Sequence, residues 1–415
     1  MTSLAFVAFV NFPRLLHEFS FRMMTVRTEL KKNAKAPVQN WGLHSSCPPK
    51  EPMMSPSVFS ETYAEAREKF LNAASEAGAS IRSYQHPSET GPHGESLYLD
   101  AAFAGNMNAR KVLVVGSGTH GIEGYSGSAA QTHWLNLHGH TLPADVAVLM
   151  LHAHNPWGFA HALRFTEENV DLNRNFVDFS APLPENPQYE RVHEAISLKC
   201  WDESSVDSMF EALDRIREDI GEQAFSDAFN GGQYTHADGI FYGGVREQWS
   251  NRAFRGALSE HLGNATEVAM IDFHTGIGPE RGHVFLCFHE SGSASYERAR
   301  AYWGERAVNR EGVTHKAIAK YQGLLVDAFV NSLPHAETTA VVVEFGTLPR
   351  RAMQRASMAA RWLRTATADS RLRAGLMSSI REAFYPNAPD WREGVLRQSG
   401  EIVNQAVAGL RDGKR

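Results

Sequence analysis

A histidine and a glutamate three residues apart, His120 and Glu123, follow the short apolar run Lys111–Val115 in the sequence VVGSGTHGIEG. An imidazole nitrogen and a carboxylate oxygen at this spacing can bind one zinc ion, which accepts both donor types at roughly 2 Å. Glycines on both sides allow the backbone to turn tightly and to aim both side chains at one point. Taken alone, the pair is weak evidence for a metal site, and a surface histidine beside a glutamate that opens a helix is the commoner arrangement.

A third ligand is needed, because a catalytic zinc usually has three protein ligands and one open position for water. His274 directly follows the apolar run Val268–Phe273 and is the candidate for this ligand. His152, His154 and His283 also flank apolar runs and are reserve candidates. No histidine stands in an H-E-x-x-H motif, so the helical zinc-protease motif is excluded.

Other polar residues could bind and process a substrate. Asn173 and Arg174 lie in the sequence DLNRNF, where the planar fork of arginine matches a carboxylate and the asparagine adds an uncharged donor. A helix cap with ion pairs in a loop is the alternative for this segment. Glu344 ends the apolar run Ala340–Phe345, and a carboxylate at the end of a buried strand must be paired, protonated or catalytic.

Two glycine-containing segments suggest other chemistries. The segment 116–121, GSGTHG, fits the dinucleotide pattern G-x-G-x-x-G, but that pattern also needs an acidic residue at the end of the second strand, where this chain has His152. The segment 124–128, GYSGS, approximates the nucleophile elbow G-x-S-x-G, although its last glycine is missing and it lies after the loop. Nucleotide binding is therefore disfavoured, and a serine hydrolase that uses Ser126 stays open as an alternative.

The elements that must position these residues alternate between helices and strands. The runs Lys111–Val115 and Asp145–Leu151, with a helix-sized stretch between them, predict a βαβ unit and a parallel pair. Val268–Phe273 and Ala340–Phe345 predict further buried strands, with His283–His289 between them. We therefore expect a single three-layer α/β/α domain with a mixed, mostly parallel central sheet.

Helices are expected outside these strands. Apolar residues recur at helical spacing from Phe59 to Ala79, and Ser60 is the expected N-cap. The stretches Asp202–Phe229 and Met353–Phe384 have the pattern of surface helices. We expect residues 57–415 to form the catalytic domain, and residues 1–56 to be a basic leader that is disordered or an over-long start.

The composition, 43% hydrophobic and 21% charged, is that of a soluble globular protein. Residues 1–56 hold 7 basic and 3 acidic side chains, which leaves 34 basic against 44 acidic ones elsewhere. Such an acidic body is not expected to bind nucleic acid, and no apolar stretch of the first 56 residues is long enough to span a membrane. Three scattered cysteines, at positions 47, 200 and 287, indicate a reducing compartment. We expect a cytoplasmic location in preference to organellar targeting, and the oligomeric state stays open.

Together, HGIE, NPWGF, Arg164, DLNRNF, DFHTG and VEFGT, in this order, resemble motifs of the zinc carboxypeptidase superfamily, which also includes aspartoacylase and succinylglutamate desuccinylase. The closest resemblance is to a carboxypeptidase-like branch of unknown substrate and covers about residues 57–390. It implies a zinc carboxypeptidase-like fold and one zinc ion per chain. The implied site residues are the zinc ligands His120, Glu123 and His274, the general base and acid Glu344, the carbonyl-polarising Arg164, and the carboxylate-binding Asn173 and Arg174.

The resemblance implies a zinc-dependent hydrolase that cleaves an amide bond next to a free carboxylate. Its substrate would be a small peptide or an N-acyl amino acid. Tyr321 is a further candidate only because peptidases of this superfamily use a mobile tyrosine some twenty residues before the glutamate. The glycine-rich stretch Gly231–Gly244 is expected to contribute selectivity, with turn formation as the alternative. An inactive carboxypeptidase-like binding module also stays open.

Overall fold

The computed structural model describes residues 58–304 and 319–413 of the chain. The expected leader, residues 1–56, lies outside these described residues, as does Cys47. Cys200 is exposed and Cys287 is buried, and neither forms a disulfide. None of the helices in the described ranges has both the length and the apolar character needed to cross a membrane.

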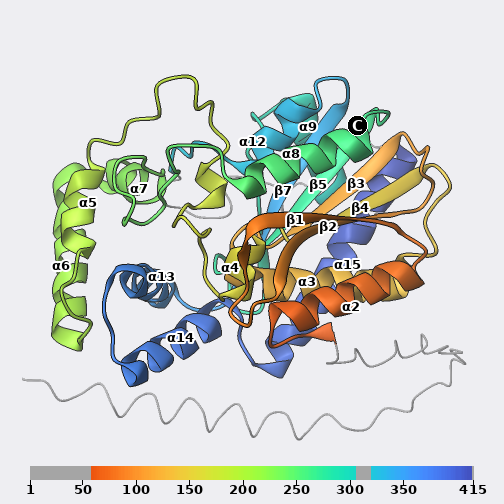
Figure 1. Cartoon of the computed structure of the whole chain (residues 1–415). Coiled ribbons are helices and arrows are strands. Elements are labelled where there is room, and N and C mark those ends of the chain that lie inside the picture. Colours follow the sequence, from red (N-terminus) through yellow and green to blue (C-terminus); the bar gives the residue numbers. More distant parts are fainter. Residues whose placement is uncertain (1–57, 305–318, 414–415) are drawn as a thin grey trace, which may run out of the picture. The chain divides into compact units, whose positions relative to one another are not determined.

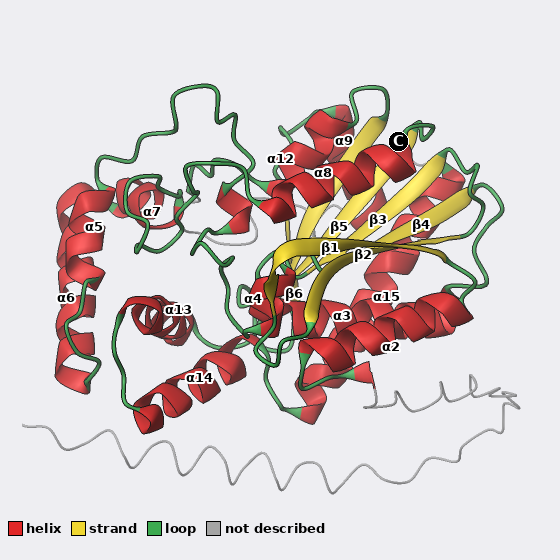
Figure 2. Ribbon diagram, viewed as in Figure 1, coloured by secondary structure: helices red, strands yellow, loops and turns green. Residues whose placement is uncertain are grey.

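A mixed sheet of seven strands forms the centre of the described part of the chain (Figures 1 and 2). The strands are, in chain order, β1 (Ser80–Thr90), β2 (Ser96–Ala104), β3 (Lys111–Ser117), β4 (Val146–His152), β5 (Glu267–Thr275), β6 (His283–Leu286) and β7 (Glu337–Phe345). Their order across the sheet is β1-β2-β4-β3-β5-β7-β6. The four central strands, β4, β3, β5 and β7, pair in parallel, whereas β1, β2 and β6 pair antiparallel at the edges.

Helices cover both faces of the sheet. The helices of this layer arrangement are α2 (Tyr63–Glu76), α3 (Gly124–His138), α8 (Trp249–Leu262), α9 (Ala294–Trp303), α12 (Leu325–Ser332) and α15 (Pro389–Asp412). Along β3, Leu113 and Val115 join a core with α2, α3, α9 and α15. The alternate residues Val112 and Val114 join a second core with α8 and α12. Because neighbouring residues of a strand point to opposite faces, this division produces three layers and confirms the expected fold class.

A third apolar cluster contains no strand residue and lies beside the sheet (Figure 1). It is built mainly from α5 (Tyr189–Ile196), α6 (Glu203–Ile220), α7 (Glu222–Asn230), α13 (Arg350–Thr365) and α14 (Ser370–Phe384). Three short helical turns complete the described elements: η2 (Gly121–Glu123), α4 (Pro156–Ala160) and η3 (Leu172–Arg174). The two surface-helix stretches expected from the sequence thus form α6 with α7 and α13 with α14, and they pack on one another.

The structure corrects two expectations about the elements. The first helix begins at Tyr63 and is capped by Thr62, whose side chain accepts a hydrogen bond from the Glu65 backbone N–H, so Ser60 is not its N-cap. The hairpin of β1 and β2 was not expected. Its outer strand β1 is largely exposed, and it therefore lacks the apolar alternation that marks a half-buried strand.

Candidate active site

The candidate site lies at the carboxyl ends of the parallel strands β3, β5 and β7. His120 and Glu123 lie in the turn and the short helix η2 that follow β3. His274 and Glu344 are each the last residue but one of their strands, and they are paired residues in the parallel register of β5 and β7. Parallel pairing therefore brings a candidate ligand and the candidate base side by side at one sheet edge, where α/β proteins place their ligand sites.

The three expected zinc ligands come together as one buried group. Ligand atoms of His120, Glu123 and His274 all lie within 4.8 Å of one another. His120 Nδ1 is 3.0 Å from Glu123 Oε1 and 3.1 Å from His274 Nδ1, and His274 Nδ1 is 3.1 Å from Glu123 Oε2. Two imidazole nitrogens and a carboxylate facing one point are a donor set that zinc accepts.

The charges around this group favour a positive charge on its ring nitrogens. Burial lowers the pKa of His274, but Asp272 and Glu123 outweigh burial and hold it well above its usual value. Burial likewise raises the pKa of Glu123, whereas His120 and His274 more than compensate and hold it well below its usual range. The donor atoms thus favour a positive charge between them, which a proton or a metal ion can supply.

Close backbone packing explains why glycine stands between His120 and Glu123. A Cβ atom on Gly121 would lie 2.0 Å from the backbone carbon of Gly158 in α4. The Ile122 N–H donates to the Leu163 carbonyl at 2.9 Å, and the Gly121 N–H donates to the Arg164 carbonyl at 3.2 Å. The HGIE and NPWGF motifs are therefore one packed unit, which also brings Arg164 to the site.

Two aspartates that the sequence analysis did not single out hold the imidazole rings. Asp272 Oδ2 lies 2.7 Å from His274 Nε2, and Thr119 Oγ1 donates to the same carboxylate. Asp171 Oδ1 lies 3.3 Å from His120 Nε2. Metal-binding histidines typically give their second ring nitrogen to such a carboxylate, which fixes the orientation of the ring. Asp272 lies two residues before His274 in the DFHTG motif, so a search for carboxylates beside the candidate ligands could have found it. Asp171, in the DLNRNF motif, is 51 residues from His120, and no sequence signal connects the two.

Glu344 is buried beside the ligand group but is not part of it. The Ile277 N–H donates to its Oε2 at 3.3 Å. Burial, together with the nearby charge of Glu123, raises the pKa of Glu344 to about 7. A carboxylate with this pKa can both take up and release a proton near neutral pH, which is what a general base and acid requires.

The two candidate arginines have different partners. Arg164 Nη1 is 3.2 Å from Glu123 Oε1, its Nε donates to Asp171 at 3.0 Å, and its Nη2 is 2.7 Å from His120 Nε2. The buried Arg174 donates to the backbone carbonyls of Asn173 and Asn230, both at 2.7 Å, and its Nε has no hydrogen-bond partner among the described residues. Arg164 is thus in contact with the ligand group, whereas the Nε–H of Arg174 is left to donate a further hydrogen bond.

Phe241, Tyr321 and Asn173 surround the arginines. The Phe241 ring lies 5.3 Å from Arg164 Cζ and 5.4 Å from Arg174 Cζ, and the Tyr321 ring lies 4.8 Å from Arg174 Cζ. Burial raises the pKa of Tyr321. The Asn173 side-chain carbonyl accepts from the Leu325 N–H at 2.8 Å, which leaves its amide N–H groups as donors.

The other candidates from the sequence lie outside this group. Ser126 is buried within α3, and in the described part of the chain its hydroxyl has no hydrogen-bond partner and therefore no adjacent base, which a nucleophile needs. His152 Nε2 is 2.9 Å from Ser128 Oγ, and His283 Nδ1 contacts Gln398 at 2.5 Å. His154 Nδ1 contacts Thr119 Oγ1 at 2.9 Å and thereby reaches Asp272, but not the ligand group itself.

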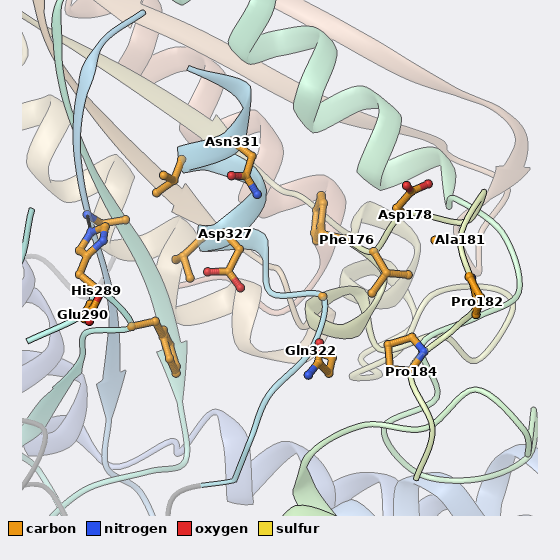
Figure 3. A pocket seen from close by; sticks show the side chains of 16 residues that line it. Phe176, Asp178, Ala181, Pro182, Pro184, His289, Glu290, Gln322, Asp327 and Asn331 are labelled. Carbon is orange, nitrogen blue, oxygen red and sulfur yellow. Dashed lines mark hydrogen bonds between the residues drawn. The ribbon is translucent and has the colours of Figure 1, made fainter. Parts of the chain in front are cut away.

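A separate cavity of 590 Å³ lies beside α12 (Figure 3). Its walls include Phe176, His289, Gln322 and Asp327. None of the candidate site residues lines it. This cavity therefore has no part in the arrangement of the metal-ligand group.

Comparisons with solved structures gave several similar proteins. Carboxypeptidase A from Helicoverpa armigera is 12% identical, with 84% of this chain and 74% of that chain covered and a TM-score of 0.42. Bovine thrombin-activatable fibrinolysis inhibitor, in complex with tick carboxypeptidase inhibitor, is 10% identical, with 86% and 100% covered and a TM-score of 0.45. Succinylglutamate desuccinylase from Chromobacterium violaceum is 13% identical, with 77% and 74% covered and a TM-score of 0.34.

The sequence matches no curated protein. A family model described as "Protein of unknown function (DUF2817)" matches residues 59–398. This match includes every residue of the candidate site, from His120 to Glu344, and most of the described chain. The chain therefore belongs to the DUF2817 family.

Proposed function

We propose that this chain is a zinc-dependent hydrolase that cleaves an amide bond next to a free carboxylate in a small peptide or an N-acyl amino acid. The observation that carries the proposal is the convergence of His120, Glu123 and His274 on one point, with Glu344 paired beside His274 on the next strand. A catalytic zinc site combines three such ligands with an open position and a nearby base.

The chain's own residues divide the chemistry between them. Zinc, when bound by the three ligands, would supply the Lewis acidity that polarises a carbonyl and acidifies water. Glu344 takes the proton of the attacking water and returns it to the leaving nitrogen. Arg164 donates hydrogen bonds to the oxygen on which negative charge develops.

Arg174 supports a substrate with a free carboxylate. It is a buried cation, and among the described residues no carboxylate forms an ion pair with it. A buried guanidinium whose Nε has no partner is costly unless an anion completes its hydrogen bonds. A substrate carboxylate bound there, with Asn173 as a second donor, would provide that anion.

The proposal is tested by the zinc content and the hydrolytic activity of the full-length protein. We expect His120→Ala to bind one zinc ion per chain fewer than the wild type, and we expect the wild type to hydrolyse some members of a panel of peptides and N-acyl amino acids. Ser126→Ala should leave the activity almost unchanged, because the Ser126 hydroxyl has no base beside it. Activity that survives His120→Ala but not Ser126→Ala would favour a serine hydrolase. Zinc binding without hydrolysis of any substrate on the panel would favour a binding module.

A further inference from the structure

A second group of metal-ligand side chains lies apart from the candidate active site. Ligand atoms of Glu190, His193 and His236 all lie within 4.8 Å of one another. His236 Nε2 is 2.8 Å from Glu190 Oε2. The two imidazole rings stack with their centroids 3.9 Å apart. The donor types are again two imidazole nitrogens and a carboxylate oxygen, here only partly buried.

Helix α5 supplies two of these residues. Glu190 and His193 are three positions apart in α5 and therefore lie on the same side of the helix. The helix is tied to the glycine-rich loop by Tyr189, whose hydroxyl donates to the Ile240 carbonyl at 3.0 Å and accepts from the Ile240 N–H at 2.7 Å. The buried contact of Tyr189 with Ile240 thus fixes the position of α5, and with it Glu190 and His193, relative to the loop.

The third residue, His236, lies in a loop whose shape is fixed from within. The buried Gln233 side chain accepts from the His236 N–H at 2.8 Å and donates to the His236 carbonyl at 2.7 Å. A turn held by its own side chain places the imidazole over α5 before any ligand arrives. Binding therefore requires little further ordering of the loop.

A carboxylate orients His193, as at the candidate active site. Asp238 Oδ1 lies 3.0 Å from His193 Nε2. Asp238 is itself held by the buried Arg361, whose Nη2 donates to Oδ2 at 3.0 Å and whose Nε donates to the Asp238 carbonyl at 2.8 Å. A carboxylate of this kind fixes the orientation of a metal-binding imidazole. The group therefore has supporting contacts beyond the three ligand residues.

We propose that Glu190, His193 and His236 form a second binding site for a divalent transition-metal ion, with zinc as the ion that best suits two imidazoles and a carboxylate. The partial exposure of the three side chains leaves the remaining coordination positions to water. The observations behind this site do not depend on the proposed hydrolase activity.

A metal ion there would stabilise the loop that borders Arg174. Gly232 leaves the space that Arg174 occupies, since a Cβ atom on Gly232 would lie 2.5 Å from Arg174 Cδ. The Tyr234 hydroxyl donates to the Arg174 carbonyl at 2.7 Å. An ion that binds only the folded loop shifts the equilibrium toward that conformation. Metal binding at the second site would thus stabilise the loop that contacts Arg174, the residue that would bind the substrate carboxylate.

The test compares zinc binding by the full-length wild type with binding by His236→Ala and His193→Ala, after dialysis against a chelator and titration with zinc alone. Each variant should bind one zinc ion fewer than the wild type at a concentration that saturates the wild type. Asp238→Asn should weaken the same site about 10- to 100-fold, as is usual for a partner that orients a ligand. His140→Ala, which changes an exposed histidine outside both groups, is the matched control and should bind as the wild type does.

Hydrogen exchange gives a second measurement. Zinc should slow amide exchange in residues 231–244 of the wild type and of the His120→Ala variant, but not in His236→Ala. Circular dichroism of each metal-free variant checks that it is folded, and Glu190→Gln replaces His236→Ala if the latter is not. Equal zinc binding and equal exchange in the wild type and the His236→Ala variant would overturn the second site. This result would not bear on the proposed active site, because His236→Ala changes only the second group.

Discussion

Replacing Glu344 by glutamine should strongly reduce turnover and at the same time stabilise the metal-free protein. Burial and the charge of Glu123 raise the pKa of Glu344 from 4.5 to about 7. Glu344 ionises more readily in the unfolded chain than in the folded one. Its ionisation therefore lowers the free energy of unfolding once the pH exceeds the pKa that Glu344 has in the unfolded chain, and this loss is complete once the pH exceeds its pKa in the folded chain. At about 1.4 kcal/mol for each tenfold change in the protonation equilibrium, the penalty reaches about 3 kcal/mol near pH 8.

Glutamine carries no charge at any of these pH values and therefore avoids the penalty. We expect the metal-free Glu344→Gln protein to gain up to about 3 kcal/mol of unfolding free energy near pH 8 and little near pH 5. Urea denaturation of both proteins at the two pH values, after removal of metal by a chelator, measures this difference. Glu68→Gln, which changes an exposed carboxylate of α2, is the control for the change in net charge.

The same variant should keep its zinc and lose activity. A general acid and base typically contributes about 10²- to 10⁴-fold, so kcat should fall by that factor while KM changes little. A Glu344→Gln protein that is equally destabilised at both pH values would refute the reasoning from burial and charge. A variant that loses its zinc would show that Glu344 is a ligand and not the base.

Two further predictions concern the residues around the ligand group. Arg174→Ala should mainly raise KM for substrates with a free carboxylate, because it removes a contact made in the ground state, and steady-state kinetics should show a smaller loss for substrates whose carboxylate is amidated. An equal loss for both substrate types would contradict the assignment of Arg174. Asp272→Asn should weaken zinc binding about 10- to 100-fold, because it removes the carboxylate 2.7 Å from His274 Nε2. Competition with a chromogenic chelator measures this affinity, and unchanged binding would mean that the His274 ring is held by other contacts.

The main strands could be predicted from sequence because each is an apolar run buried on both faces. The runs that begin at Lys111 and Val268 correspond to β3 and β5, which are adjacent and parallel. Their polar neighbours His120 and His274 could therefore be placed at one edge before the structure was known. The structure brings these residues together as expected.

Other features depend on contacts that a single sequence does not show. The cap of α2 is an exception, because Glu65 follows Thr62 three residues later, and this pattern is a capping signal in the sequence that Ser60 lacks. The edge strand β1 could not be recognised because most of its residues face solvent. The roles of Asp171 and Asp272 follow from the distances of their carboxylates to the imidazole rings, which the motif letters alone do not show.

The parallel register of β5 and β7 also bears on the order of folding. His274 lies 151 residues after Glu123, and the chain must pair β5 with β3 before the third ligand reaches the first two. Contacts of such long sequence separation form late, because the loop-closure entropy must be overcome first. Glu344 follows His274 more closely in the chain than His274 follows Glu123, so the pairing of β7 with β5 closes the shorter loop. A refolding chain should thus place Glu344 beside His274 before His274 reaches His120 and Glu123, so that tight metal binding and the proton-transfer group are completed in the same late step.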